Sequence, residues 1–186
     1  MPASRNEQSR RAILDAAMFL ICDLGYDNVS IEAIARRAGV SKQTIYRWWP
    51  SVGAVVLEAA TESLDAVVTF QDTGEVVADL RAQLTGIVEL ITTTGFGLVY
   101  RGLMAAGQSD PQLLSAIFDQ IIEPNITAFT SRIAQAQERG EIRADADVQT
   151  LRDVLYGVIE YRLLHAMPTD PAYVDALLGV AFSGVR

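Results

Sequence analysis

The sequence predicts an all-α protein, with a three-helix domain over residues 1–50 followed by a helical bundle over residues 51–186. Two observations predict this class. Apolar residues recur every three or four positions through most of the chain, which is the spacing of one face of a helix. No stretch sustains the alternation of apolar and polar residues, closed by a tight turn, that a β-hairpin requires.

The first expected helix ends before Gly25. One of its faces carries the apolar side chains of Ile13, Ala17, Leu20 and Leu24. Gly25 stands where a helix commonly ends in a left-handed conformation, which glycine adopts without steric penalty. These residues therefore predict an amphipathic helix closed by a glycine.

Two short helices are expected next, joined by a tight turn. Ser30 and Ser41 are placed as N-caps, because a serine hydroxyl accepts a hydrogen bond from a free amide of the first turn. Gly39 lies in the turn, where a positive φ is needed. Pro50 ends the third helix because it lacks an amide hydrogen and forces its predecessor out of the helical region. This succession of polar caps, glycine and apolar positions is typical of a helix-turn-helix.

The third helix is expected to expose side chains that suit DNA. They are Lys42, Gln43, Thr44, Tyr46 and Arg47. Such side chains reach base edges in a major groove or the phosphates beside it. Trp48 and Trp49 follow, and packing is the favoured role for both, with stacking on bases as the alternative.

The charge is distributed unevenly along the chain. The net charge is −8, which taken alone argues against a nucleic-acid partner. Residues 1–50, however, carry seven Lys or Arg against five Asp or Glu, whereas residues 51–186 carry eight against eighteen. The single lysine, Lys42, lies in the first part. This asymmetry indicates one region that meets phosphates and one that does not.

Four stretches of the N-terminal region form a recognisable pattern. They are Ile13-Leu14-Asp15-Ala16-Ala17, Gly25-Tyr26, Ser30-Ile31-Glu32-Ala33-Ile34-Ala35 with Ala38-Gly39-Val40-Ser41-Lys42, and Ile45-Tyr46-Arg47-Trp48-Trp49-Pro50. Together they closely resemble the DNA-binding domain of the tetracycline-repressor (TetR) family, over residues 8–60. The chain departs from the family pattern at Val52 and Gly53, where many members carry a lysine that contacts phosphate.

The resemblance implies roles for individual residues. Ser30 and Tyr46 would touch phosphates, while Lys42 and its two successors would meet bases or nearby backbone. The full set of candidate DNA-binding residues is Ser30, Arg36, Ser41, Lys42, Gln43, Thr44, Tyr46, Arg47 and Trp48. The partner would be double-stranded DNA carrying a palindromic operator.

The C-terminal region is expected to be a string of longer helices. Glycine, proline and polar clusters predict breaks at residues 72–74, 94–95, 107–111, 140–147 and 168–171. Pro124 is expected to kink or divide its helix. The resemblance implies a homodimer in which the last two long helices form a four-helix bundle with their mates. The candidate interface residues are Leu151, Leu155, Val158, Ile159, Tyr173 and Leu177.

The remaining helices would enclose a pocket for a small, largely apolar effector, by the same resemblance. The candidate effector-binding residues are Phe96, Tyr100, Met104, Phe118 and His165. The alternative for the first four is ordinary core packing, and for His165 it is a capping or surface role. The function so implied is a repressor that leaves its operator when the effector binds. The alternative is a helical protein-interaction module that has lost DNA binding.

Catalytic motifs are not found in the sequence. It has one His and one Cys, and it lacks metal-ligand spacing, a nucleophile turn and a phosphate-binding glycine loop. We therefore expect no enzymatic activity, no catalytic residue, no metal and no cofactor. The single Cys22 and the absence of a long apolar run predict a cytoplasmic protein with no membrane partner.

Overall fold

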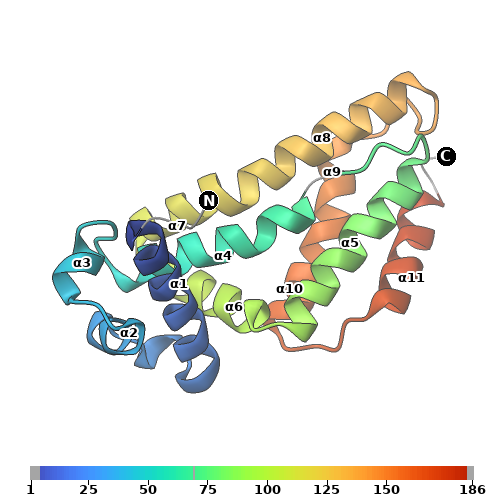
Figure 1. Cartoon of the computed structure of the whole chain (residues 1–186). Helices are drawn as coiled ribbons and strands as arrows, with labels where there is room; N and C mark the ends of the chain where they lie inside the picture. Colours follow the sequence, from blue (N-terminus) through green and yellow to red (C-terminus); the bar gives the residue numbers. More distant parts are fainter. Residues whose placement is uncertain (1–4, 69, 184–186) are drawn as a thin grey trace. The chain divides into compact units, whose positions relative to one another are not determined.

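The computed structural model describes residues 5–68 and 70–183, and within them every regular element is a helix (Figure 1). The all-α prediction is confirmed. The chain divides into two compact units. Unit 1 contains the described residues up to Ser63 together with Gly95–Phe118, and unit 2 contains Leu64–Thr94 and the described residues from Asp119 onward. This division differs from the predicted boundary after residue 50, because helices distant in sequence pack onto the N-terminal domain.

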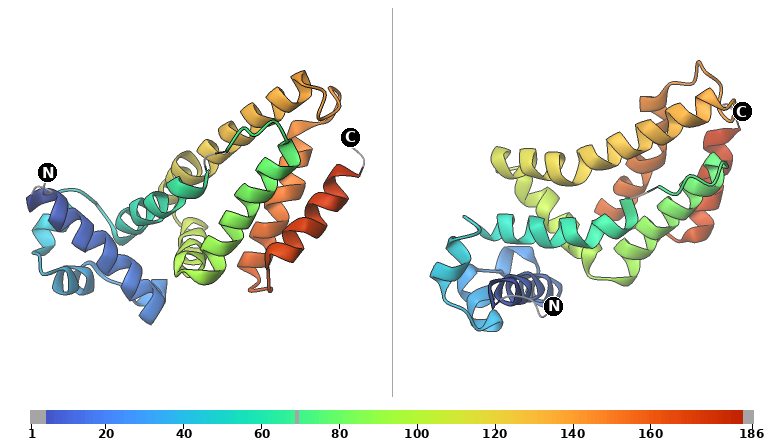
Figure 2. Two further views of the ribbon diagram at one scale, coloured as in Figure 1. Left: turned by 45° about the vertical axis from the view of Figure 1, so that its right-hand side comes forward. Right: turned by 45° about the horizontal axis from the view of Figure 1, so that its top comes forward.

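Unit 1 consists of the helix-turn-helix and the helices packed around it (Figure 2). Its elements are α1 (Arg5–Leu24), the 3-10 turn η1 (Tyr26–Asn28), α2 (Ile31–Ala38), α3 (Lys42–Tyr46), most of α4 (Val52–Val68), α6 (Phe96–Gly107) and α7 (Pro111–Ile117). Its core is formed by buried aliphatic side chains of α1, α2, α3 and α4, among them Ile13, Ile34, Ile45 and Val55. Leu24 was predicted on the same face of α1, but it is exposed at the last residue of the helix, and Ile21 takes its place in the core.

Two glycines let α6 approach the N-terminal domain closely. A Cβ atom on Gly102 would lie 2.5 Å from the Cβ of Tyr26, and one on Gly95 would overlap the sulfur of Cys22. No larger residue fits at either position without displacing its neighbour. The helix-turn-helix domain and α6 therefore form one packed body, which explains why residues 95–118 belong to unit 1.

Unit 2 is a helical bundle in which α5, α10 and α11 lie side by side (Figures 1 and 2). After the end of α4, its elements are α5 (Val76–Thr93), α8 (Glu123–Glu138), α9 (Val148–Arg152), the π-helical turn η3 (Asp153–Gly157), α10 (Val158–Leu164) and α11 (Pro171–Phe182). A second π-helical turn, η2 (Phe118–Ile122), leads into α8. The predicted breaks between helices are confirmed. Pro124 occupies the first turn of α8, directly after η2, so a π-helical turn interrupts the α-helix just before the proline at which the sequence predicted a kink or a division.

The core of unit 2 combines an apolar cluster with a buried ion pair. Fully buried aliphatic and aromatic side chains come from every long helix of the unit, for example Leu84, Phe129, Leu155 and Leu178. At one end of this core Arg132 of α8 meets Asp79 of α5, with Nε 2.8 Å from Oδ2.

This ion pair belongs to a network of charged groups. Thr73 donates to Asp79 from both its amide and its hydroxyl, and Glu141 accepts from the amide of Val76 at 2.6 Å. Glu141 also lies 3.6 Å from the Arg132 guanidinium. The network thus fixes the start of α5 and the turn after α8 to one buried cation.

Candidate DNA-binding surface

The turn between α2 and α3 has the geometry of a helix-turn-helix. Ser30 caps α2 by accepting from the amide of Ala33 at 3.2 Å, and Ser41 caps α3 by accepting from Thr44 at 3.2 Å. Gly39 adopts φ 68°, a left-handed conformation that ends α2. Ile45 is fully buried and anchors α3 to the domain. The caps and the turn predicted from the sequence are confirmed.

The candidate DNA-binding residues all reach the surface at this site. Seven of them are exposed: Ser30, Arg36, Ser41, Lys42, Gln43, Tyr46 and Arg47. Thr44 and Trp48 are half-buried, and the Thr44 hydroxyl lies 3.0 Å from that of Ser41. The residues of α2, α3 and their caps therefore expose cations, an amide and hydroxyl groups, which are the groups that contact phosphates and base edges.

The two tryptophans have different environments. Trp49 is buried, and its indole N–H donates to Glu58 Oε2 at 2.6 Å. Trp48 packs edge-on against it with ring centroids 5.3 Å apart, and the Arg47 guanidinium lies 5.2 Å from the Trp48 ring. Packing, the role favoured for Trp49, is therefore its role in this structure.

Only some cations of this domain are free to meet phosphates. Arg10 pairs with Glu58 and Glu62, and hydrogen bonding to Glu62 is the main cause that raises the pKa of Arg10. Lys42 donates to Glu32 at 2.7 Å. This contact raises the pKa of Lys42 and lowers that of Glu32.

Three arginines complete the cationic groups around α2 and α3. Arg37 stacks on the ring of Phe19. Within the described part of the chain, Arg36 and Arg47 form no ion pair and are exposed. The surface thus presents Arg36, Arg37, Lys42 and Arg47, and among the described residues Lys42 is the one that is paired with a carboxylate.

The charged network that holds α3 was not foreseen from the sequence. The Glu58 carboxylate accepts from Trp49 with one oxygen and from Arg10 Nε with the other, at 2.7 Å. It thereby joins the segment after α3 to α1 and α4. No local pattern marks this network, because its members lie far apart in the chain.

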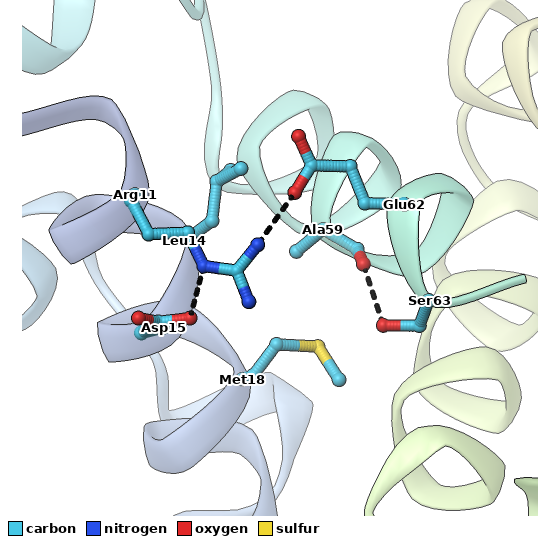
Figure 3. A pocket seen from close by; sticks show the side chains of 7 residues that line it. All are labelled: Arg11, Leu14, Asp15, Met18, Ala59, Glu62 and Ser63. Carbon is cyan, nitrogen blue, oxygen red and sulfur yellow. Dashed lines mark hydrogen bonds and ion pairs between the residues drawn. The ribbon is translucent and has the colours of Figure 1, made fainter. Parts of the chain in front are cut away.

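A shallow hollow lies beside this network, between α1 and α4 (Figure 3). It has a volume of about 100 Å³ and is lined by Arg11, Leu14, Asp15, Met18, Ala59, Glu62 and Ser63. Arg11 reaches across it from α1 and pairs with Asp15 at 3.1 Å and Glu62 at 3.3 Å. Pockets for small molecules usually have volumes of about 300–1,000 Å³. The hollow is therefore too small and too charged for an apolar effector.

The candidate effector-binding residues fall into different environments. Phe96 and Tyr100 are buried and stacked, with ring centroids 6.0 Å apart. Met104 is half-buried and Phe118 is exposed. These four belong to unit 1, whereas His165 belongs to unit 2.

His165 has the environment of a helix cap. It is exposed at the C-terminus of α10, where its ring packs on Tyr161 and Nδ1 lies 2.8 Å from the Tyr161 carbonyl oxygen. These contacts fit a capping role, which the sequence left open as an alternative to effector binding.

Part of the predicted dimer interface requires correction. Leu151, Leu155 and Ile159 are buried in the core of unit 2 and cannot reach a second subunit without unfolding the first. The sequence pattern correctly marked an apolar face but not which neighbour covers it. Val158, Tyr173 and Leu177 are half-buried, so their place in the interface stays a prediction.

Other apolar side chains of the last helices are exposed in the single chain. On η3 and α10 they are Val154, Tyr161 and Leu164. On α11 they include Val180, which is 74 % exposed, and Ala172, Ala176 and Gly179 are exposed on the same helix. We call this set the α10–α11 face. Its residues were not among those selected from the sequence.

In the described residues we find neither a cluster of metal-binding side chains nor a single helix suited to span a membrane. Across residues 5–68 and 70–183, no group of three His, Cys, Asp or Glu side chains is placed to hold a metal ion. In the same residues no single helix combines the length and the apolar composition needed to cross a membrane.

The fold and this surface define a helix-turn-helix DNA-binding protein, and comparison with known proteins identifies its family. A profile of "Bacterial regulatory proteins, tetR family" matches residues 13–59, and one of "Tetracyclin repressor-like, C-terminal domain" matches residues 70–181. The chain therefore belongs to the TetR family of DNA-binding transcription regulators. The resemblance inferred from the sequence is confirmed.

Relatives match over nearly the whole chain. The uncharacterized HTH-type transcriptional regulator YdeS of Bacillus subtilis is 33% identical, over 98% of this chain and 92% of its own length. The DNA-binding transcriptional repressor TetR of Mycobacteroides abscessus is 30% identical over 94% and 92%. The crystal structure of the TetR family transcription regulator SCO0332 superposes with a TM-score of 0.78 at 37% identity, covering 96% of this chain and 99% of that one.

Proposed function

We propose that this regulator is a homodimeric repressor that leaves a palindromic operator when a small, largely apolar effector binds its C-terminal domain. The observation that carries the proposal is the exposed surface of α2 and α3, whose caps and buried Ile45 hold Lys42, Gln43, Tyr46 and Arg47 outward. The name of the 30% identical repressor from Mycobacteroides abscessus supports the sign of regulation. Because such a regulator acts on the bacterial chromosome, its location would be the cytoplasm.

The composition of α11 supports a dimer. Its only charged residue is Asp175, which pairs with Arg81 at 2.6 Å. A helix that is apolar all round belongs in an interior, yet one side of α11 is exposed in the single chain. Small residues on that side, Ala176 and Gly179, would let a second helix approach closely. A second copy of the chain, related by a two-fold axis, would cover the α10–α11 face.

The dimer would explain how one recognition helix per subunit reads a palindrome. Two half-sites on one face of B-DNA lie about 34 Å apart, so both α3 helices must be held at that spacing. An effector that favours another spacing would lower operator affinity by shifting the population of dimers away from the binding conformation.

The proposed effector contacts lie on α6 and after it. Phe96 and Tyr100 form a buried aromatic pair at the start of α6, followed by Met104 one turn later and by Phe118 after α7. Because α6 packs directly on Tyr26 through Gly102, a ligand that moved α6 would act on the packed body that carries α3. Apolar and aromatic linings are usual for such pockets.

Selection of bound sequences from a random DNA pool by the purified protein, at near-physiological salt, tests this function. Recovery of an inverted repeat with half-sites one helical turn apart is the expected result. Failure of a folded, dimeric protein to enrich any sequence, in the presence and absence of candidate effectors, would contradict operator binding and favour a protein-interaction module. With the operator known, largely apolar compounds that release the protein from it identify the effector class.

A further inference from the structure

Glu32 and Lys42 form an exposed ion pair on the DNA-binding surface itself. Glu32 lies in the first turn of α2, and Lys42 is the first residue of α3. Their Oε1 and Nζ atoms are 2.7 Å apart, and the side chains are 60% and 53% exposed. The carboxylate therefore occupies the place at the Lys42 ammonium that a DNA phosphate would take.

This pairing matters because the surface has few cations. Arg10 and Arg11 are held by carboxylates of α1 and α4. Among the described cations near α2 and α3, Lys42 is the one with a carboxylate partner. Glu32 thus neutralises one of the few groups that release counterions from DNA, and it adds a negative charge that phosphates repel.

The effect of Glu32 differs between two modes of DNA binding. A non-specific complex depends on loose electrostatic contact with phosphates, which gives no fixed geometry to displace Glu32. A specific complex seats α3 in the major groove through base contacts, which fixes the ammonium beside the backbone. An exposed pair is weak and is readily exchanged there for a phosphate.

We propose that Glu32 is a specificity-determining residue, which holds Lys42 away from phosphates on non-specific DNA and releases it when α3 is seated in the operator. This inference deepens the proposed function and rests on it. Glu32 discriminates by weakening the binding of non-specific DNA, and it adds no contact with the operator.

Glu32→Gln tests the proposal in the full-length protein. Affinity is measured by fluorescence anisotropy as a function of salt, for the selected operator and for a random-sequence duplex of about 30 base pairs. On the random duplex, at about 0.1 M salt, we expect affinity to rise about tenfold for each additional phosphate that the freed lysine neutralises. The slope of log affinity against log salt concentration should steepen by about 0.9 per phosphate. On the operator we expect a smaller rise and an unchanged slope. The ratio of operator to random affinity therefore falls.

Two further variants separate this role from a general effect of charge. Asp23→Asn removes an exposed acidic charge from the end of α1, outside α2 and α3, and is expected to leave the affinity ratio unchanged. Combining Glu32→Gln with Lys42→Gln is expected to abolish the increased affinity for random DNA, because that increase requires the lysine.

The outcomes distinguish this inference from the proposed function. Equal salt slopes for wild type and Glu32→Gln on the random duplex would overturn the proposed role of Glu32. An increase in affinity that persists without Lys42 would also overturn it. In either case, operator binding by the wild type would still support the proposed function. Absence of operator binding by the wild type would overturn both.

Discussion

Removing one member of the buried ion pair of Arg132 and Asp79 is expected to destabilise unit 2 strongly. The two side chains are 2% and 1% exposed, and two nitrogens of Arg132 lie 2.8 and 2.7 Å from Oδ2 of Asp79. Replacing Arg132 with Met keeps the side chain unbranched and apolar along its length and removes the charge. It leaves the Asp79 carboxylate in the interior with Thr73 as its hydrogen-bond donor among the described residues, and it removes one of the two cations near Glu141, the other being Arg139.

The expected cost follows from what remains after the substitution. Removing one partner of a buried ion pair destabilises a protein by about 3–5 kcal/mol, because the other charge stays buried and unpaired. For a chain of this length, this lowers Tm by about 6–20 °C. The loss is a large share of a typical unfolding free energy of about 5–15 kcal/mol.

Removing both charges has a different expected result. In the described structure, the Nη1 and Nη2 atoms of Arg132 have no well-aligned hydrogen-bond acceptor. The guanidinium is therefore only partly compensated for the loss of water. Exchanging both charges for apolar residues, Arg132→Met with Asp79→Leu, is expected to recover most of the stability lost in the single variant.

Unfolding by guanidinium chloride, followed by far-UV circular dichroism, measures these differences in the free energy of unfolding. Arg81→Met is the matched control. Arg81 also pairs with an aspartate, Asp175, but these two side chains are exposed, at 50% and 59%. The control is expected to cost less than about 1 kcal/mol. A cost of that size for Arg132→Met, or a double variant no more stable than the single one, would refute the reasoning.

Three further predictions concern DNA binding, assembly and pH. Lys42→Ala should weaken operator binding and flatten its log–log salt slope by about 0.9 for each phosphate no longer neutralised, and an unchanged slope would show that Lys42 does not meet phosphate. Val180→Glu should yield folded monomers in light scattering, because Val180 is exposed in the single chain and its change should not disturb the core. The control Leu98→Glu, at an exposed residue of α6, should stay dimeric. If Val180→Glu also stayed dimeric, the dimer interface would lie elsewhere. Hydrogen bonding to Arg139 lowers the pKa of Asp72 from 3.8 to about 2, so its stabilising effect should be present above pH 4 and disappear as pH falls toward 2. Unfolding midpoints of wild type and Asp72→Asn should therefore converge at the acid end, and a constant difference would contradict this.

Local features of the fold and of the DNA-binding surface were predictable from the sequence. The caps at Ser30 and Ser41 and the left-handed turn at Gly39 depend on the side chain and backbone of one residue and its next few neighbours. The ends of the later helices follow from glycine and proline in the same way. The exposure of Lys42, Gln43, Tyr46 and Arg47 follows because Ile45 is the single apolar anchor of such a short helix.

The candidate dimer interface shows where local pattern was insufficient. Leu155 and Val154 are neighbours on one apolar stretch, yet Leu155 is buried in the core of its own subunit and Val154 is exposed. The spacing of apolar residues predicts that one face of a helix is apolar. Which side chains of that face are buried depends on where α5 and α11 pack. The π-helical turn η3 also changes the register of this face, and no residue pattern announced it.

The sequence by itself determined the helical class, the helix-turn-helix and the family, because these depend on residue types at short and regular spacing. Only the tertiary structure decided which charges meet. Arg132 lies 53 positions from Asp79, Arg10 lies 48 from Glu58, and even Lys42 and Glu32 are separated by a turn and ten positions. An ion pair forms within a few ångströms in space, and that distance is set by the packing of whole helices. The cations available to DNA, and the face available to a second subunit, are therefore properties of the folded chain.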